Sequence, residues 1–403
     1  MINTLIHRLL RRRHFWRHAT FSEIAELYAS RTLRILALHM VSLFIAIYLY
    51  QNGYSLVFIA FYLAAYFCIK MFIALPAAQI AARFGPKHGI LLSNILYIPS
   101  LIAFTQVSEY GLLAIAIFGF FQAWSATIYD VCYLTDFSKV KHSEHAGKEL
   151  GFMSVIEKVA GGISPLIGGL IASFISPEAT IIAAAFLFMI SSWPLMRTAE
   201  QTATHQRLQF RGFPWRSTWR SFRAQSAVGF DVVATGTIWT LFIAVVVFAG
   251  AGQELYVKIG ALASVTILTS FIAAHVFGQI IDKRQGGKLL RYGTIAKILS
   301  HTMRPFISTP VGVAGMNISS EVATTGYSMA LTRGMFDTAD LSGRRITYIF
   351  FIEIAANLGA TIACVIFGTL VLLYGDVEGM KAFFFAAAAY ISLLATARFA
   401  LYR

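Results

Sequence analysis

Long apolar runs recur along the whole chain and are separated by short polar stretches. Four of the clearest cover residues 33–50, 112–134, 227–248 and 383–402, and each is close to the ~20 residues that an α-helix needs to cross a bilayer. Because the lipid core offers no partners for backbone polar groups, such segments are expected to be helices. The pattern predicts an all-α, polytopic membrane protein.

Twelve spanning segments can be drawn, which we expect to form two six-helix bundles related by pseudo-symmetry. The longest polar stretch divides them, and in it Trp215, Trp219 and Phe222, each followed by an arginine, predict an interfacial helix. The expected domains are a basic N-terminal arm (1–32), a first bundle (33–196), a basic linker (197–226) and a second bundle (227–403). The expected helices cover residues 33–50, 56–81, 88–104, 112–134, 150–173, 180–196, 227–248, 260–281, 289–307, 315–331, 347–373 and 383–402.

Composition supports a membrane protein. Hydrophobic residues make up 57% of the 403 residues and charged residues only 13%, whereas a soluble domain carries roughly 25% charge. The three cysteines, Cys68, Cys132 and Cys364, all fall in apolar runs and have no metal-binding spacing. We therefore expect neither a metal nor another cofactor.

The net charge of +14 follows the predicted topology. The two termini and every second loop hold 25 of the 33 lysines and arginines, whereas the other loops hold only Lys258 and Lys381. By the positive-inside rule, both termini and the linker are then cytoplasmic, and the location is a plasma membrane, most simply a bacterial inner membrane. The anionic lipids of the inner leaflet account for the basic charge, so no nucleic-acid partner is expected. We expect a monomer.

The two halves of the chain resemble each other. Glu144-x-x-Gly147-Lys148 followed by Glu157 recurs 196 positions later as Asp340-x-x-Gly343-Arg344 followed by Glu353. A second match, residues 78–83 against residues 278–283, is offset by 200 positions. Two parallel six-helix repeats are a common transporter plan, with the substrate held between them near the middle of the membrane.

The segment 278–288 resembles the signature loop of the major facilitator superfamily, which joins a glycine, an aspartate and basic residues between two helices. Here these are Gly278, Asp282 and Lys283, followed by Gly286 and Lys288. The resemblance implies a secondary transporter that works by alternating access, with the loop as a cytoplasmic latch. The latch would be held in one rocking state and broken in the other.

The corresponding loop of the first half departs from the family pattern. It keeps Arg83, Gly85 and Lys87 but has Ala82 where the family usually has the aspartate. The family resemblance therefore implies no complete latch in this half. Asp130 or Asp136 are alternative partners for Arg83.

The fifth predicted helix is similar to a Gly-Pro-x-x-Gly-Gly motif that the family associates with antiporters. Its residues are Ser164, Pro165, Gly168 and Gly169, with serine in place of the first glycine. The resemblance favours export over import, although small residues and a proline also serve close helix packing and bending. In the fourth helix Gly119 stands where drug-proton antiporters of the family carry an arginine, so their usual arrangement is not supported.

Ionisable side chains inside spanning helices are costly unless they are paired or hydrated, so each is a functional candidate. Glu157 and Glu353 occupy matched positions of the two repeats, each above a stripe of small and polar residues. Desolvation favours the protonated form of a carboxyl in an apolar cavity, so at least one of them is a candidate for proton coupling. A structural gate pair, with Lys158, Arg34 or the backbone as partner, is the alternative.

Other intramembrane charges are candidates for coupling or gating. Lys297, His301 and Arg304 form a basic stripe that would contact an anionic substrate or a lipid head group, or pair with Glu321. His39, Lys70 and Asp231 are the further coupling or gating candidates, beside Glu321, Glu157 and Glu353.

The sequence thus predicts a secondary transporter for a small molecule, coupled to protons and surrounded by membrane lipids. It has no nucleotide-binding GxxxxGK[ST] motif, and an enzyme is disfavoured because HExxH and GxSxG motifs are also missing. A lipid or lysolipid flippase of the same fold is the alternative, since 34 phenylalanines would suit an apolar cavity. The substrate itself is not indicated.

Overall fold

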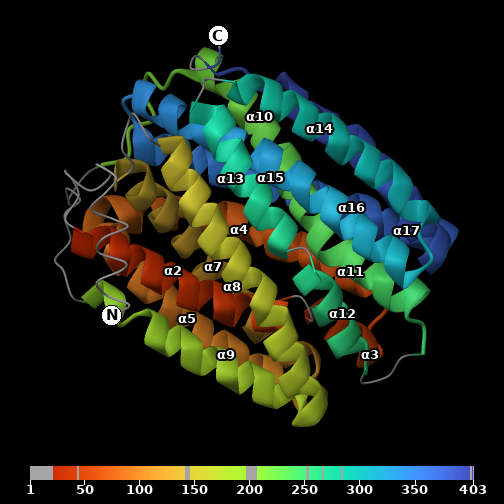
Figure 1. Cartoon of the computed structure of the whole chain (residues 1–403). Coiled ribbons are helices and arrows are strands. Elements are labelled where there is room, and N and C mark those ends of the chain that lie inside the picture. The colour runs from red at the N-terminus through yellow and green to blue at the C-terminus, as the bar shows by residue number, and fades with distance from the viewer. Residues whose placement is uncertain are drawn as a thin grey trace, which may run out of the picture.

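The computed structural model describes residues 21–42, 45–140, 146–196, 207–250, 254–265, 267–282, 285–399 and 402, and this part of the chain contains helices and no strands. The helices of the first half, red to yellow-green in Figure 1, lie mostly together at the lower left, and those of the second half, green to blue, at the upper right. The first half comprises α2 (Phe21–Ser42) with α3 (Ile45–Gln51), α4 (Leu56–Phe84), α5 (Pro86–Thr105), the short α6 (Val107–Tyr110), α7 (Leu112–Val140), α8 (Ala146–Phe174), and α9 (Pro177–Ser191) with the 3-10 turn η2 (Pro194–Met196).

The second half begins with α10 (Trp215–Val232), which continues through the π-helical turn η3 (Val233–Ile238), α11 (Trp239–Phe242) and a second π-helical turn, η4 (Ile243–Val247). It then comprises α12 (Glu254–Val265), α13 (Ile267–Asp282), α14 (Gly286–Met303), the 3-10 turn η5 (Arg304–Phe306), α15 (Pro310–Leu341), α16 (Arg345–Tyr374), α17 (Asp376–Ile391) and the 3-10 turn η6 (Ser392–Thr396).

Within the described ranges, eight helical segments are by length and composition able to cross a membrane. The sixth, eighth, ninth and tenth segments are shorter or more polar, and with them the chain has the twelve predicted segments in the predicted order. The polar ones carry buried charges, as described below. The all-α prediction is confirmed.

Several helix boundaries differ from the prediction: the first segment begins at Phe21 instead of residue 33, the eighth at Glu254 instead of residue 260, and the tenth covers Pro310–Leu341 instead of 315–331. The seventh segment begins at Trp215 instead of residue 227, because the small and polar side chains of Thr218, Ser221 and Ala224 are buried. The Tyr348 hydroxyl of α16 bonds Ser221 at 2.9 Å, so this turn is part of the packed seventh segment and not a separate interfacial helix. The last segment lies at 376–396 instead of 383–402, since α17 begins after Gly375, whose φ is 79°.

Glycines bring the first and fifth helices of each half into close contact. In the first half, a Cβ on Gly168 of α8 would lie 2.5 Å from the Met40 carbonyl oxygen of α2. In the second half, Cβ atoms on Gly229 of α10 and Gly359 of α16 would each lie 1.8 Å from a carbonyl oxygen of the other helix. The same pair of helices is therefore joined by backbone contact in both halves, in keeping with the internal repeat.

The two bundles meet along α8 with α12 and α13, and along α4 with α16. We name the two ends of the molecule by residues there: the Gly53 end, where α4 begins, and the Gly85 end, where α4 finishes. At the Gly53 end the Tyr256 hydroxyl of α12 donates to Gln51 of α3. At the Gly85 end the rings of Phe137 and Phe336 are 5.7 Å apart. The bundles thus contact each other at both ends.

The predicted fifth-helix motif makes packing contacts in α8. Ser164 donates to the Ala160 carbonyl oxygen within the helix. The Pro165 carbonyl oxygen faces Gly260 of α12, where a Cβ would lie only 2.6 Å away, and a Cβ on Gly169 would lie 2.9 Å from the Tyr256 carbonyl oxygen. Gly168 packs on α2 of the same bundle, so these residues hold α8 both against α2 and against α12 of the other bundle.

We predict that Gly260→Ala lowers the free energy of unfolding by about 1–3 kcal/mol, because the added methyl overlaps the backbone of α8. Thermal unfolding in detergent measures the effect. The control is Gly315→Ala in α15, where nothing lies within 4 Å of the added Cβ, and which should be neutral or slightly stabilising. Equal melting temperatures for the two variants would contradict the packing account.

Candidate functional site

Lys70 of α4 connects the two bundles through a pair of carboxylates. Its Nζ lies 3.4 Å from Asp130 Oδ2 of α7, in its own bundle, and 3.5 Å from Glu353 Oε1 of α16, in the other bundle. The side chains of Lys70 and Glu353 are both only 8% exposed. Asn357, one turn further along α16, donates to Glu353 at 2.7 Å. We call Lys70, Asp130, Glu353 and Asn357 the lysine bridge.

The position of the lysine bridge follows from the helix lengths. Lys70 is the fifteenth of the 29 residues of α4, so it lies about 21 Å from either end of that helix. Glu353 is eight residues from the start of α16, or about 12 Å from the Gly85 end. The bridge therefore lies between the middle of the membrane and the Gly85 end.

A second ion pair crosses between the bundles and is more accessible. Lys158 of α8 donates to Glu321 of α15, and their side chains are 31% and 22% exposed. The Thr325 hydroxyl lies 3.5 Å from the same Glu321 oxygen. We call Lys158 and Glu321 the exposed pair.

Glu157, the neighbour of Lys158, is paired within its own bundle. Arg31 of α2 donates to it at 2.8 Å, and the Arg31 guanidinium lies over the Tyr133 ring of α7 at 4.3 Å. The His39 side chain of α2 lies at the protein surface, and a Cβ on Gly161 of α8 would lie 3.5 Å from its ring. Its electrostatic neighbours are Lys158, Arg31, Glu157 and Glu321.

Arg34 is a buried cation whose bonded partners are neutral. It donates to Asn94 and, at 3.4 Å each, to Ser93 and Ser125, and its guanidinium lies 3.8 Å from the centre of the Tyr129 ring. From the sequence, Arg34 was expected only as a partner for Glu157. The first helix was expected to begin at residue 33, whereas α2 begins at Phe21 and includes both Arg31 and Arg34.

A fully buried polar network lies inside the second bundle. Asp231 of α10 accepts a bond from His301 Nε2 at 2.7 Å, pairs with Lys297 Nζ at 3.3 Å and accepts a further bond from Tyr327. Lys297 also donates to Ser320 at 2.7 Å. These side chains come from α10, α14 and α15, so the network ties three helices together.

Arg304 completes this network and fixes the protonation of His301. It donates to His301 Nδ1 at 3.0 Å, and because arginine has no acceptor, Nδ1 must carry the lone pair and Nε2 the hydrogen that Asp231 accepts. His301 is therefore neutral. Arg304 also donates to Ser320 and Thr235. We call Asp231, Lys297, His301, Arg304 and Tyr327 the aspartate network; it contains two cations and one carboxylate.

Of the alternatives for the basic stripe, pairing with Glu321 is wrong. Lys297 and His301 contact Asp231, whereas Glu321 pairs with Lys158 of the other bundle. Glu157 pairs with Arg31 instead of Lys158 or Arg34. The matched carboxylates of the two repeats thus differ, since only Glu353 pairs across the bundles.

The predicted latch is only partly described. Gly278 is buried in α13 and Asp282 is the last residue of that helix, but the Asp282 side chain and Lys283 lie outside the described parts of the chain. In the other loop, Lys87 lies 4.0 Å from Glu26 of α2. Arg83 is exposed, with its guanidinium over Phe84, while Asp130 pairs with Lys70.

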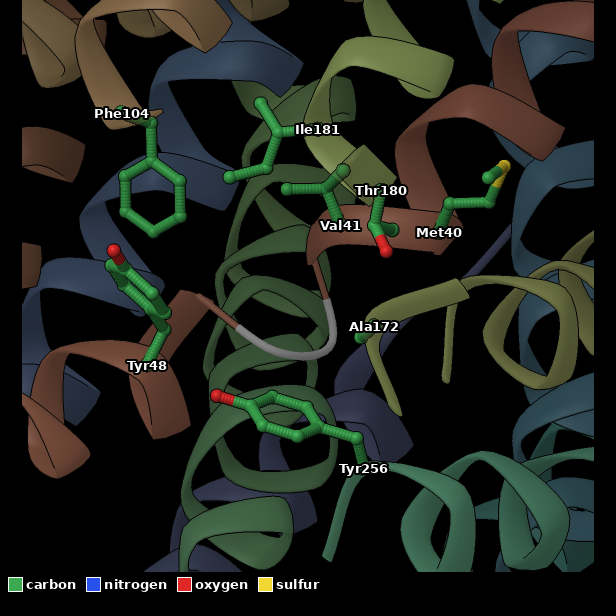
Figure 2. Close-up of a pocket in the computed structure, with 8 residues that line it drawn as sticks. All are labelled: Met40, Val41, Tyr48, Phe104, Ala172, Thr180, Ile181 and Tyr256. Carbon is green, nitrogen blue, oxygen red and sulfur yellow. The ribbon is translucent and has the colours of Figure 1, made fainter. Parts of the chain in front are cut away.

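A small apolar pocket lies beside the last turn of α2 and the start of α3 (Figure 2). It is lined by Met40, Val41, Tyr48, Phe104, Ala172, Thr180, Ile181 and Tyr256. Except for Tyr256 of α12, all of these belong to the first bundle, and the pocket contains none of the charged groups described above. Over the described ranges, no three His, Cys, Asp or Glu side chains are placed to hold a metal ion.

We predict that Asp231→Asn destabilises the protein by about 3–5 kcal/mol, because Lys297 and Arg304 would be left buried without their counter-ion. The melting temperature in detergent should fall accordingly. A matched control is Glu378→Gln, which breaks a surface ion pair with Lys381. It should change stability by at most about 1 kcal/mol. A wild-type melting temperature for Asp231→Asn would contradict the role assigned to the aspartate network.

Comparisons with known proteins identify the family. The sequence profile of the Major Facilitator Superfamily matches residues 27–364, and no curated protein matches the sequence with significance. Among solved structures, the human organic anion transporter MFSD10 is similar with a TM-score of 0.70 and 10% identity, over 93% of this chain and 99% of that chain. A single-residue variant of the Escherichia coli fucose:proton symporter FucP has a TM-score of 0.65 and 15% identity, over 94% and 100%.

A bacterial homologue of the iron transporter ferroportin, in an outward-facing state, has a TM-score of 0.67 and 14% identity, over 92% of this chain and 97% of that chain. Identities this low show a shared fold alone, but the family profile covers most of the chain. With its twelve helices in two bundles, the chain belongs to the Major Facilitator Superfamily.

Proposed function

We propose that this transporter works as a proton-coupled carrier by alternating access, and that Glu353 is the carboxylate that takes up the proton. Membership of the family makes the chain a membrane transporter of small molecules and not an enzyme. The observation that supports Glu353 is the lysine bridge, in which Lys70 lies between a carboxylate of each bundle. One proton can therefore decide whether the bundles are joined at this point.

The cost of releasing the bundles is kept low by Asp130. Removing one partner of a buried ion pair is normally expensive, because the other charge stays buried without compensation. When Glu353 is protonated, Lys70 still has Asp130 at 3.4 Å within its own bundle. Protonation thus removes the ionic contact of the lysine bridge between the bundles without leaving an unpaired cation in the membrane.

Glu157 is a poorer coupling candidate than the internal repeat implies. Its partner Arg31 belongs to the same bundle, so protonation of Glu157 would not change the attraction between bundles. Arg31 would also keep its contact with the Tyr133 ring. We therefore assign Glu157 a structural role.

The contacts at the two ends suit a rocking movement. At the Gly53 end the bundles meet at Tyr256 and Gln51, and at the Gly85 end at Phe137 and Phe336. Opening one end while the other stays closed requires only a rigid-body rotation of one bundle against the other. The predicted latch around Asp282 would stabilise the closed Gly85 end.

We propose that the Gly85 end is cytoplasmic and that the protein is a monomer in a plasma membrane. The asymmetry of lysine and arginine between alternate loops supports this orientation. For the direction of transport, export is supported only by the resemblance of residues 164–169 to the antiporter motif. The packing contacts of Ser164, Pro165, Gly168 and Gly169 account for these residues without any direction.

We predict that Glu353→Gln reduces proton-driven accumulation at least tenfold while substrate exchange without a gradient stays within about twofold of wild type. Glutamine mimics the protonated carboxyl, so the bundles can still rock but no longer respond to the proton. The measurement uses proteoliposomes and a labelled solute that the wild type accumulates from a broad panel. Glu157→Gln is the matched control and should keep the wild-type ratio of the two modes.

The melting temperatures of the two variants complete this test. Glu353→Gln should remain close to wild type, because Asp130 still compensates Lys70. Undiminished proton-driven accumulation in Glu353→Gln would refute its coupling role. Equal loss of both transport modes together with a lower melting temperature would instead show that Glu353 is structural.

We predict that a cysteine at Ser217, near the start of α10, reacts with an impermeant reagent only after the cells are opened. A cysteine at Asn52, at the Gly53 end, should react in intact cells. Both positions are exposed, and the reference is a variant in which Cys68, Cys132 and Cys364 are replaced. Labelling of Ser217→Cys from outside intact cells would overturn the proposed orientation.

A further inference from the structure

We propose that the substrate is a small organic anion, and that its carboxylate or phosphate group takes the place of Glu321 at Lys158. This rests on the proposed function, in that the site lies between the two bundles of an alternating-access carrier. It adds a substrate class and a binding residue to that function.

The exposed pair is the cross-bundle contact that a ligand can reach. Its side chains are 31% and 22% exposed, against 8% for both Lys70 and Glu353 in the lysine bridge. Breaking a partly accessible ion pair costs less than breaking a fully buried one, because water or a ligand can reach the separated charges. An incoming anion that offers Lys158 an equivalent partner can therefore displace Glu321 at little cost.

The charge balance around this pair favours an anion over a cation. The lysine bridge, the aspartate network, the exposed pair, the Arg31–Glu157 pair and Arg34 together contain six basic side chains and five carboxylates. His301 is neutral because Arg304 donates to it. Positive charge thus exceeds negative charge by one among these groups, and a bound monoanion would make their total neutral.

Glu321 remains compensated when it leaves Lys158. Lys297 of the aspartate network donates to Ser320 and Thr324, which flank Glu321 along α15, and Arg304 also donates to Ser320. The two cations of the aspartate network, which share one carboxylate, therefore bond to residues beside the displaced Glu321. A cationic substrate would have the opposite effect, because it would draw Glu321 away and leave Lys158 unpaired in a region that is already positive.

A hydrogen-bonding group for such a ligand lies close to Lys158. Gly161 follows Lys158 by one turn of α8, and the exposed His39 ring of α2 lies beside it. The imidazole can donate to a second oxygen of a carboxylate or phosphate. Lys158 then forms one side of the binding site and His39 the other. Without a ligand, the Glu321 carboxylate occupies the ligand's place at Lys158.

The test measures ligand-induced shifts of the melting temperature for wild type, Lys158→Gln and Glu321→Gln. The probes are benzoate, lactate and lysophosphatidate as anions, with benzylamine and benzyl alcohol as controls that match benzoate in size. Anions should stabilise the wild type while the two controls do not. Lys158→Gln should bind the same anion at least tenfold more weakly, whereas Glu321→Gln, which lacks the competing carboxylate, should bind it several-fold more tightly.

The opposite signs of the two variants separate binding from stability. If the pair is merely structural, both variants will lose melting temperature and bind every probe equally badly, which overturns the proposal. Stabilisation by benzylamine or benzyl alcohol in place of the anions also overturns it. Stabilisation by lysophosphatidate alone supports an anionic lipid head group, and stabilisation by benzoate or lactate supports a soluble organic acid.

Failure of this inference can be distinguished from failure of the proposed function. If no anion binds but another solute is accumulated with a proton gradient in a manner that depends on Glu353, the carrier mechanism stands and the substrate class falls. Lys158→Arg provides a folding control, since it keeps the charge at this position. It should retain anion binding within a few-fold of wild type, and loss of binding in this properly folded variant would contradict a simple anion contact.

Discussion

A charged side chain inside a membrane must have a partner, and this requirement organises the middle of the protein. Every basic group described there has a carboxylate, a polar group or an aromatic ring beside it. Some of these partners lie in the same bundle, as Arg31 and Glu157 do, and others lie across the bundles, as Lys70 and Glu353 do. Pairs of the first kind hold a bundle together in every state, whereas pairs of the second kind must form and break as the bundles move.

Glycine packing places these charges where they can meet. The backbone contacts of α2 with α8, and of α10 with α16, bring the first and fifth helices of each half so close that a Cβ would not fit. These helices carry Arg31, Glu157, Asp231 and Glu353, so their axial and rotational positions decide which charges pair. The two halves share this contact but not the partners, which gives a symmetric fold an asymmetric set of ion pairs.

Sequence analysis predicted the helices far better than it predicted the partners. The twelve segments follow from the length of the apolar runs, which depends on the bilayer alone. The partner of Lys297 and His301 depends on how helices are rotated and cross, and it proved to be Asp231 and not Glu321. Likewise, the matched spacing of Glu157 and Glu353 in the two repeats carried no information on whether each partner lies in the same bundle or in the other one.

The proposed mechanism depends most on one step: a proton on Glu353 breaks its ionic contact with Lys70 across the bundles. Spin labels at Phe84 and Leu341, exposed residues of the two bundles at the Gly85 end, would measure the separation by double electron–electron resonance. The account predicts that acidification changes the distance distribution of the wild type, and that Glu353→Gln shows the acidic distribution at every pH. A Glu353→Gln distribution that still changes with pH as the wild type does would contradict it.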